Sequence, residues 1–412
     1  MTYRALFGAV DFGGHLVGQT GAGKSELAAV MQQHYGVGLD SRHLPGSWSS
    51  TANALEGLAF SAKDVLITID DFAPEGFSHD IQRYHATAAR LFRAQGNGAA
   101  RGRMRADGTL RPDKPPRGFV LSTGEDIPKG HSIKARTLIL ELEPGGLSWQ
   151  RVTQAQQLAA SGVYAAAMAG FIGWLAEDYD GRTAAFRVHH TYFRNTLQQR
   201  GHKRTVDAGA QLLATYKSLL AFALEVGALN EAEHAAQWAR INTGMQTALE
   251  PQAALQAQSD PVARFGELLN GLFVSGRAHV ADAATGEYPG EGWGWEALLT
   301  YSALEGDATR YRPKGTRIGW VDGIDLYLEP SATYAELYKF ARDQGESVPI
   351  SERVLWKRLA ERGVIVSREA PHLTVKRSVY GSGRIRVLHL SATLYMSGAG
   401  GATWASAGKC CA

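Results

Sequence analysis

The sequence predicts an α/β domain with a parallel sheet, followed by an all-helical region and a C-terminal winged-helix-like domain. Three patterns support this fold class. Over residues 1–147, short runs of β-branched residues and leucine alternate with helices or loops, which is typical of strands buried on both faces of a parallel sheet. Residues 148–275 carry long Ala- and Leu-rich helical patterns in which glycine is sparse. Residues 331–395 follow the order helix, helix, strand, strand, strand.

Two further segments complete the predicted organisation. Residues 276–330 are a strand-rich connector, and residues 396–412 are a flexible tail dominated by small residues. The two cysteines of the chain, Cys410 and Cys411, are adjacent in this tail, where they are poor candidates for a disulfide or a metal site. Cysteine usage of this kind is typical of a reducing cytosol.

The overall charge is nearly balanced. The formal net charge is +3, so any signal for nucleic-acid binding must be local. We find no signal peptide and no apolar run of transmembrane length, and we therefore expect a cytoplasmic protein of a prokaryotic cell, or of its phage or plasmid, that has no membrane partner.

A glycine-rich motif identifies the first ligand. Residues 18–25 match G-x-x-x-x-G-K-[ST], after a predicted strand over 15–17 and before a predicted helix over 26–33. The glycines let backbone N–H groups surround phosphate oxygens, and the helix directs its positive dipole end at the same anion. Lys24 is expected to reach the β- and γ-phosphates, and the Ser25 hydroxyl to bind Mg²⁺. The motif predicts ATP and Mg²⁺ as ligands, bound by Gly18, Gln19, Thr20, Gly21, Ala22, Gly23, Lys24 and Ser25.

An acidic pair follows the next predicted strand, residues 65–69. We expect this strand to lie beside the strand of the phosphate loop, so that Asp70 and Asp71 emerge at the same edge of the sheet. Asp70 is then placed to hold Mg²⁺ through a bound water, and Asp71 to act as the catalytic base. The alternative is a strand that ends in a solvated acidic turn, because Asp-Asp-x-x-Pro suits a turn.

Two further positions are candidates for catalysis. The predicted strand over 118–122 ends in Ser122 and Thr123, and a hydroxyl here either orients the attacking water or caps the next turn. Arg136 precedes the predicted strand over 137–142, where it would stabilise transition-state charge from a neighbouring subunit or pair with an acid at the surface. Lys134 is the other candidate for that role.

These elements and their spacing resemble the superfamily-three helicases of viruses and plasmids, within the AAA+ class. The layout also resembles the ATPase segments of mobile-element proteins in which a primase-polymerase is joined to a helicase, through residues 48–53 and 122–128. The resemblance covers about residues 10–145 and implies a hexameric ring with sites shared between subunits. It also implies that Thr123 or Ser122 orients the water. The family usually has Asn at that position, so this chain departs from the pattern there.

The resemblance gives a role to a basic interval as well. Residues 90–117 hold eight basic residues offset by Asp107 and Asp113, and the glycines among them suit a hairpin or mobile loop. In those helicases the corresponding segment contacts single-stranded DNA in the ring channel, and a basic loop of this kind tracks a phosphate backbone electrostatically. The alternative is a solvated basic loop. The expected DNA contacts are Arg93, Arg101, Arg103, Arg105 and Lys114.

The sequence therefore predicts an ATP-dependent DNA helicase or translocase of a mobile genetic element. Its expected partners are single-stranded or forked DNA, further copies of itself, and a primase module or replication initiator. The competing hypothesis is a nucleotide-dependent DNA-binding initiator or switch that separates no strands. The basic interval favours the motor, because a switch has no need of a basic loop between the acidic strand and the next strand.

Overall fold

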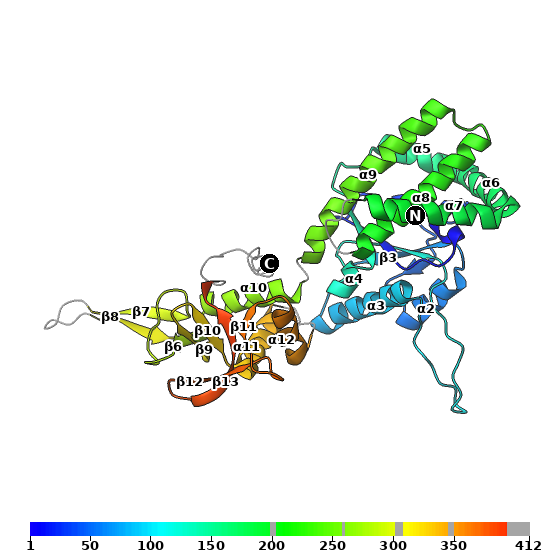
Figure 1. Ribbon diagram of the computed structural model, residues 1–412. Helices are drawn as coiled ribbons and strands as arrows, with labels where there is room; N and C mark the ends of the chain where they lie inside the picture. Colours follow the sequence, from blue (N-terminus) through cyan, green and yellow to red (C-terminus); the bar gives the residue numbers. More distant parts are fainter. Residues whose placement is uncertain (198–202, 258–259, 301–307, 345–349, 394–412) are drawn as a thin grey trace. The chain divides into compact units, whose positions relative to one another are not determined.

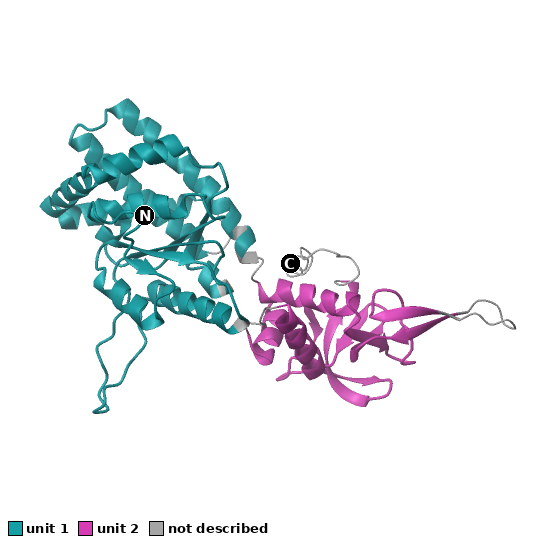
Figure 2. Ribbon diagram, turned by 180° about the vertical axis from the view of Figure 1, so that it is seen from behind, with its two compact units in different colours: residues 1–256 teal, residues 257–412 magenta. Residues whose placement is uncertain are grey.

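The computed structural model describes residues 1–197, 203–257, 260–300, 308–344 and 350–393. The chain divides into two compact units, residues 1–256 and residues 257–412 (Figures 1 and 2). The expected flexible tail, 396–412, lies outside the described residues together with its two cysteines.

The first unit is built on a parallel sheet, as the sequence predicts, and the sheet has five strands because a short strand at residues 46–47 joins the four predicted ones. Their order across the sheet is β2-β3-β4-β1-β5. The strands are β1 (Gly13–Val17), β2 (Gly46–Ser47), β3 (Leu66–Phe72), β4 (Phe119–Gly124) and β5 (Thr137–Glu141).

The expectation that the acidic strand lies beside the strand of the phosphate loop is wrong, because β4 lies between them. Leu121 of β4 pairs with Thr68 of β3 on one side and with Gly14 of β1 on the other. Each residue of β4 is buried, which suits a strand at the centre of the sheet. The acids still reach the edge that carries the phosphate loop, because the strands are parallel.

Helices cover both faces of this sheet. One face carries α2 (Ala52–Ser61) and α3 (Ser78–Asn97), whose side chains form a core with alternate residues of β3 and β4. The other face carries α1 (Lys24–Gln32) and the helical region. Short helices complete the unit: η1 (Arg4–Phe7), η2 (Gln33–Tyr35) and α4 (His131–Lys134). The two cores explain why the strands read as continuous apolar runs rather than as alternating ones.

The helical region contains α5 (Trp149–Ala160), α6 (Val163–Glu177), α7 (Tyr179–Thr196), α8 (Lys203–Glu225) and α9 (Glu231–Ala257). The apolar stretch before residue 178 is divided at Gly162, whose φ of +84° ends one helix and begins the next at an angle of 65°. Within the part of the chain that the structure describes, no single helix has the length and apolarity of a membrane span, and only the bent pair α5 and α6 reaches them together.

Two buried glutamines complete the hydrogen bonding of the sheet where a strand is missing. The short β2 does not reach the first half of β3, and there Gln32 of α1 accepts from Thr68 N (2.9 Å) and donates to Leu66 O (3.1 Å). At the other edge, Gln252 of α9 accepts from Ile139 N of β5 (3.2 Å) and donates to its carbonyl oxygen. Buried backbone groups need such partners, so both helices are tied to the sheet edges.

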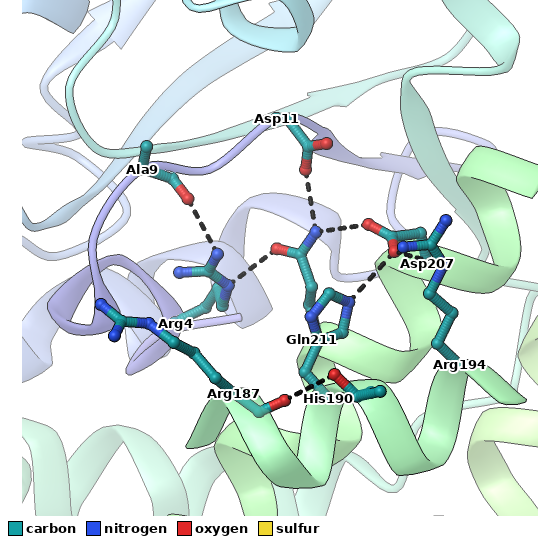
Figure 3. Close-up of polar contacts among 9 residues, drawn as sticks. Arg4, Ala9, Asp11, Arg187, His190, Arg194, Asp207 and Gln211 are labelled. Carbon is teal, nitrogen blue, oxygen red and sulfur yellow. Dashed lines mark hydrogen bonds and ion pairs between the residues drawn. The ribbon is translucent and has the colours of Figure 1, made fainter. Parts of the chain in front are cut away.

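A polar cluster attaches the N-terminal segment to the helical region (Figure 3). Arg4 is buried, and its guanidinium donates to Gln211 Oε1 (2.9 Å) and to two backbone carbonyl oxygens. Gln211 Nε2 donates to Asp207 Oδ2 (2.8 Å) and to Asp11 Oδ1 (2.9 Å). The His190 ring bonds Asp207 Oδ1 (3.1 Å), which gives this histidine a structural partner.

The second unit is built on a six-stranded sheet, with a large hydrophobic core that includes α10, α11 and α12 and a smaller core that includes β12. Its six-stranded sheet has the order β11-β13-β10-β9-β6, with β12 paired to β13, and β7 and β8 form a separate hairpin. The elements are α10 (Pro261–Val274), β6 (Ala278–Asp282), β7 (Trp295–Thr300), β8 (Ala308–Pro313), β9 (Thr316–Asp322), β10 (Asp325–Leu328), α11 (Pro330–Asp343), α12 (Glu352–Glu361), β11 (Ile365–Ser367), β12 (Val375–Val379) and β13 (Gly383–Ser391).

The boundaries of this unit differ from the predicted ones in two places. Helix α10, which the sequence pattern groups with the helical region 148–275, packs here, where Phe265 and Leu269 join the core of the second unit. Strand β13 pairs with β10 as well as with β11 and β12, so residues 276–330 and 331–395 share one sheet. Sequence patterns locate these elements but carry no information on which strands pair across a predicted boundary.

Replacing Gln252 tests the edge contact of β5. In Gln252→Ala the buried N–H and C=O of Ile139 lose their partners, which is expected to lower the free energy of unfolding by about 1–3 kcal/mol. The matched control is Gln246→Ala, an exposed position of the same helix, with an effect within about 0.5 kcal/mol. Urea unfolding measures both, and equal effects of the two substitutions would contradict the assignment.

Candidate functional site

The phosphate loop is shaped to receive an anion. Gly21 and Gly23 have φ of +81° and +86°, a backbone region that other residues rarely adopt, and a Cβ on Gly18 would lie 2.4 Å from a carbonyl oxygen. Helix α1 begins at Lys24 without a side-chain cap, so its first N–H groups are available to a ligand. Lys24 Nζ donates to the carbonyl oxygens of Gly18 (2.7 Å) and Gln19 (2.8 Å), which holds its ammonium group over the loop.

The Asp70 carboxylate lies at the centre of the polar contacts. Ser25 Oγ donates to Asp70 Oδ1 at 2.8 Å, and Thr123 Oγ1 donates to the same oxygen. Thr123 Oγ1 also accepts from Asp71 N at 3.2 Å. The structure thus brings the predicted residues of the loop, the acidic strand and β4 to one point.

These donors suit a magnesium ion. A hydroxyl and a carboxylate are hard oxygen ligands, and Mg²⁺ in proteins is commonly held by one or two carboxylates together with waters and substrate phosphates. Among the described residues there is no group of three His, Cys, Asp or Glu side chains that would form an all-protein metal site. Ser25 and Asp70 are therefore the residues that would hold Mg²⁺ here.

The two hydroxyl residues at the end of β4 lie on opposite faces of the sheet. Ser122 is fully buried, accepts from Trp48 Nε1 (2.9 Å) and bonds His15 Nδ1 (2.9 Å). The other ring nitrogen of His15 donates to the Asp126 carbonyl (2.9 Å), and burial lowers the pKa of His15 to about 4, so the neutral ring accepts from Ser122. Thr123 is the hydroxyl that faces the phosphate loop.

A cleft of about 460 Å³ surrounds the loop, which is within the usual range for a ligand site. Asp71 reaches it from the end of β3 with φ of +68°, an uncommon conformation for a residue with a side chain. Thr20 of the loop donates to Glu125, another carboxylate of the lining. The lining residues are Thr20, Gly21, Gly23, Lys24, Ser25, Glu26, Asp71, Thr123, Gly124, Glu125, Trp149 and Gln156.

Sequence reasoning gave no role to five of these lining residues. Glu26, Gly124 and Glu125 are close to recognised motifs, and their positions alone would have suggested them. Trp149 and Gln156 come from α5, which no motif connects to the loop. Their place in the cleft becomes evident only from the packing of α5 on α1, where Gln156 Nε2 donates to the Glu26 carboxylate.

Arg136 lies far from the phosphate loop of its own chain. It precedes β5, and because Thr137 pairs with Gly13 at the start of β1, the arginine is at the sheet edge opposite the loop. Its guanidinium donates to Ser132 O (2.8 Å) and Asn97 Oδ1 (3.0 Å), while Nε is buried without a partner. Burial and nearby cations lower the pKa of Arg136, and burial also lowers the pKa of Lys134.

The part of the basic interval that follows α3 forms a hairpin that extends from the body of the first unit between α3 and β4 (Figure 1, cyan). Met104 pairs with Leu110 across it. Arg101 and Arg105 are exposed, whereas Arg103 is held at the base by Glu56 and Asn53 of α2. The other two expected contacts lie elsewhere: Arg93 is exposed on α3, and Lys114 lies 5.7 Å from the Phe60 ring.

Comparison with known proteins gives two similarities. Residues 5–114, which include the phosphate loop, the acidic pair and the hairpin, match a family described as "Domain of unknown function (DUF927)". A solved structure titled "SCCmec type IV Cch - active helicase" is similar with a TM-score of 0.54 and 14% sequence identity, over 94% of this chain and 66% of that one. No curated protein matches the chain. At this identity, the similarity shows a shared fold, and the chain spans about two thirds of that structure.

The buried His15 makes stability depend on pH. Burial holds its pKa in the folded protein at about 4, below the ordinary value of 6.5, so between these values only the unfolded chain takes up the proton. Stability is therefore expected to fall as the pH drops from 6.5 toward 4, by about 3 kcal/mol over the full interval. The variant His15→Gln lacks the titrating ring, so it should lose less stability at low pH than the parent protein. The difference between the melting temperatures at pH 7 and pH 4.5, compared for the two proteins, measures this effect. Parallel pH dependence in both proteins would contradict the role of His15.

Proposed function

We propose that this protein is an ATP-dependent DNA motor of helicase type from a mobile genetic element. The observation that carries the proposal is that Ser25 and Thr123 both donate to the Asp70 carboxylate beside the phosphate loop. A P-loop-like sheet, an exposed basic hairpin and a fold shared with an active helicase add support. Localisation in the cytoplasm remains a prediction, as does a primase module or replication initiator as partner.

The side chains of the cleft divide the work of hydrolysis. Bound Mg²⁺ would neutralise charge on the phosphate oxygens. Lys24 donates to the β- and γ-phosphates in place of its two carbonyl partners. Asp70 is engaged by two hydroxyl groups, which suits it to hold the metal with Ser25. Asp71 projects into the cleft and accepts the proton of the attacking water. Thr123 bonds both the Asp70 carboxylate and the Asp71 backbone, and so orients these groups.

A ring explains the position of Arg136. At the sheet edge opposite the phosphate loop, its guanidinium has no route to the phosphates of its own chain, so a role in hydrolysis requires a second subunit. A ring of subunits, six as the resemblance implies, would place each arginine against the cleft of its neighbour. Gly96 supports this side chain, because a Cβ there would lie 2.5 Å from Arg136 Cδ.

The hairpin is the proposed contact with single-stranded DNA. Arg101 and Arg105 are exposed and available to phosphates, and the exposed Met104 and Leu110, which pair across the hairpin, offer apolar contact to bases. Arg103 has a structural role instead, because its ion pair with Glu56 fixes the base of the hairpin. Loss of Arg103 is then expected to weaken DNA binding by loosening the hairpin.

The second unit is proposed to act as a winged-helix-like DNA contact. Cations occur on both elements that could contact DNA. Lys357 and Arg358 of α12 pair with Glu361, and Arg386 of β13, which lies directly opposite Lys376 of β12, pairs with Glu369 (3.5 Å). Because like charges that face each other across strands repel, a DNA phosphate beside Lys376 would be stabilising. We therefore include the β12–β13 hairpin in the proposed DNA contact of this unit.

DNA-stimulated ATP hydrolysis tests the motor. We expect single-stranded DNA to raise the ATPase rate, Asp71→Asn to abolish hydrolysis, and the double variant Arg101→Ala/Arg105→Ala to lose most of the stimulation while the basal rate stays. The matched control is Arg187→Ala, an exposed arginine of α7, with unchanged stimulation. Hydrolysis that is indifferent to DNA in the parent protein would favour the switch over the motor.

Mixing of inactive variants tests the shared site. Lys24→Ala and Arg136→Ala are each expected to lack ATPase activity, and a mixture of the two should regain part of it. The reason is that some interfaces then combine an intact loop with an intact arginine. A mixture of Lys24→Ala with Asp71→Asn is the control, because both changes fall in the same half of the site and no interface recovers. Equal rates in the two mixtures would rule out action of Arg136 between subunits.

A further inference from the structure

A large aromatic side chain borders the phosphate loop without being buried. Trp149 is 51% exposed, whereas Trp48 in the core of the same unit is 3% exposed. Its ring lies against the loop, because a Cβ placed on Gly23 would be 3.2 Å from ring atom Cη2. Leu147 lies beside it, at 2.9 Å from the same point. An exposed indole next to an apolar side chain forms a flat apolar wall in an otherwise polar cleft.

The ring is held in place by the helix that carries it. Trp149 is the first residue of α5, which packs on α1, the helix that begins at the phosphate loop. A hydrogen bond also connects the two helices, since the Gln156 side chain of α5 donates to the Glu26 carboxylate of α1. The wall therefore keeps its position relative to the loop.

The lining of the cleft comes from two groups of elements with different chemistry. Asp71 and Thr123 belong to β3 and β4, while Glu26 belongs to α1 and Trp149 and Gln156 belong to α5. The first N–H groups of α1 would hold the phosphates of a bound nucleotide. With its γ-phosphate toward Asp71, such a nucleotide has the exposed Trp149 ring available for its base.

We propose that Trp149 is the stacking platform for the nucleobase of the bound nucleotide. This inference rests on the proposed function and adds the part of the site that binds the base. Stacking on an aromatic ring tolerates any base, so the platform provides affinity for nucleotides in general rather than a choice between ATP and other nucleoside triphosphates. The magnitude of one base–aromatic stack corresponds to about a tenfold or larger change in affinity.

Calorimetric binding separates the base from the phosphates. The probes are a non-hydrolysable ATP analogue and inorganic tripolyphosphate, both with Mg²⁺, and the proteins are the parent chain, Trp149→Ala, Trp149→Phe and Tyr192→Ala. We expect Trp149→Ala to bind the analogue at least about tenfold more weakly and tripolyphosphate unchanged. Trp149→Phe should retain most of the affinity. Tyr192→Ala, which removes an exposed aromatic ring of α7, should match the parent chain.

Other results overturn the inference in distinguishable ways. If Trp149→Ala weakens both probes equally, the ring supports the phosphate loop and does not bind the base. If it weakens neither, the ring has no part in binding, and the proposed function stands without it. A parent chain that binds neither probe would overturn the proposed function and the platform together.

Fluorescence gives a second readout that does not depend on the alanine variant. The analogue is expected to change the tryptophan emission of the parent chain, and tripolyphosphate is not. In Trp149→Phe the change should disappear while the analogue still binds. A change of equal size in Trp149→Phe would assign it to another tryptophan and contradict the platform.

Discussion

The carboxylate of Asp70 connects the elements of the candidate site through hydrogen bonds. Its Oδ1 atom receives the Ser25 hydroxyl from the first turn of α1 and the Thr123 hydroxyl from β4, while Asp70 itself lies near the end of β3. One atom thus fixes three elements at the same edge of the sheet. Because β4 lies between β3 and β1, the Thr123 hydroxyl bonds residues of β3 and also lines the cleft of the phosphate loop. The proposed division between Asp70 as the residue that would hold Mg²⁺ and Asp71 as the catalytic base follows from this arrangement.

Local sequence patterns predicted the helices and strands of the fold well. They did not predict which strands and helices that are distant in sequence pack together. The apolar runs before Ser25 and Asp70 identified buried parallel strands. An apolar run does not indicate the position of a strand in the sheet, because central strands and strands second from the edge are buried alike. The break at Gly162 and the joining of β13 to β10 depend on packing of remote segments. The glutamines Gln32 and Gln252 illustrate the same point, since each replaces a missing strand from a helix that is distant in sequence.

The candidate site was predictable to the extent that its chemistry lies within short motifs. Residues 18–25 and the acidic pair carry their signal in consecutive positions, and the structure brings them together. The choice between Ser122 and Thr123 needed the strand order, because alternation along β4 sends one hydroxyl to His15 and the other to Asp70. Trp149 lay beyond any motif, since its place in the cleft depends on how α5 packs on α1.

Binding of a non-hydrolysable ATP analogue with and without Mg²⁺ tests the central role of Asp70 most directly. If Asp70 and Ser25 hold the metal, Mg²⁺ will tighten binding to the parent protein and to Asp71→Asn, and this tightening will be lost in Asp70→Asn. The carboxamide retains the shape of the side chain and accepts the same hydroxyl groups, so the fold of the site is preserved. Mg²⁺-dependent tightening that persists in Asp70→Asn would contradict the account.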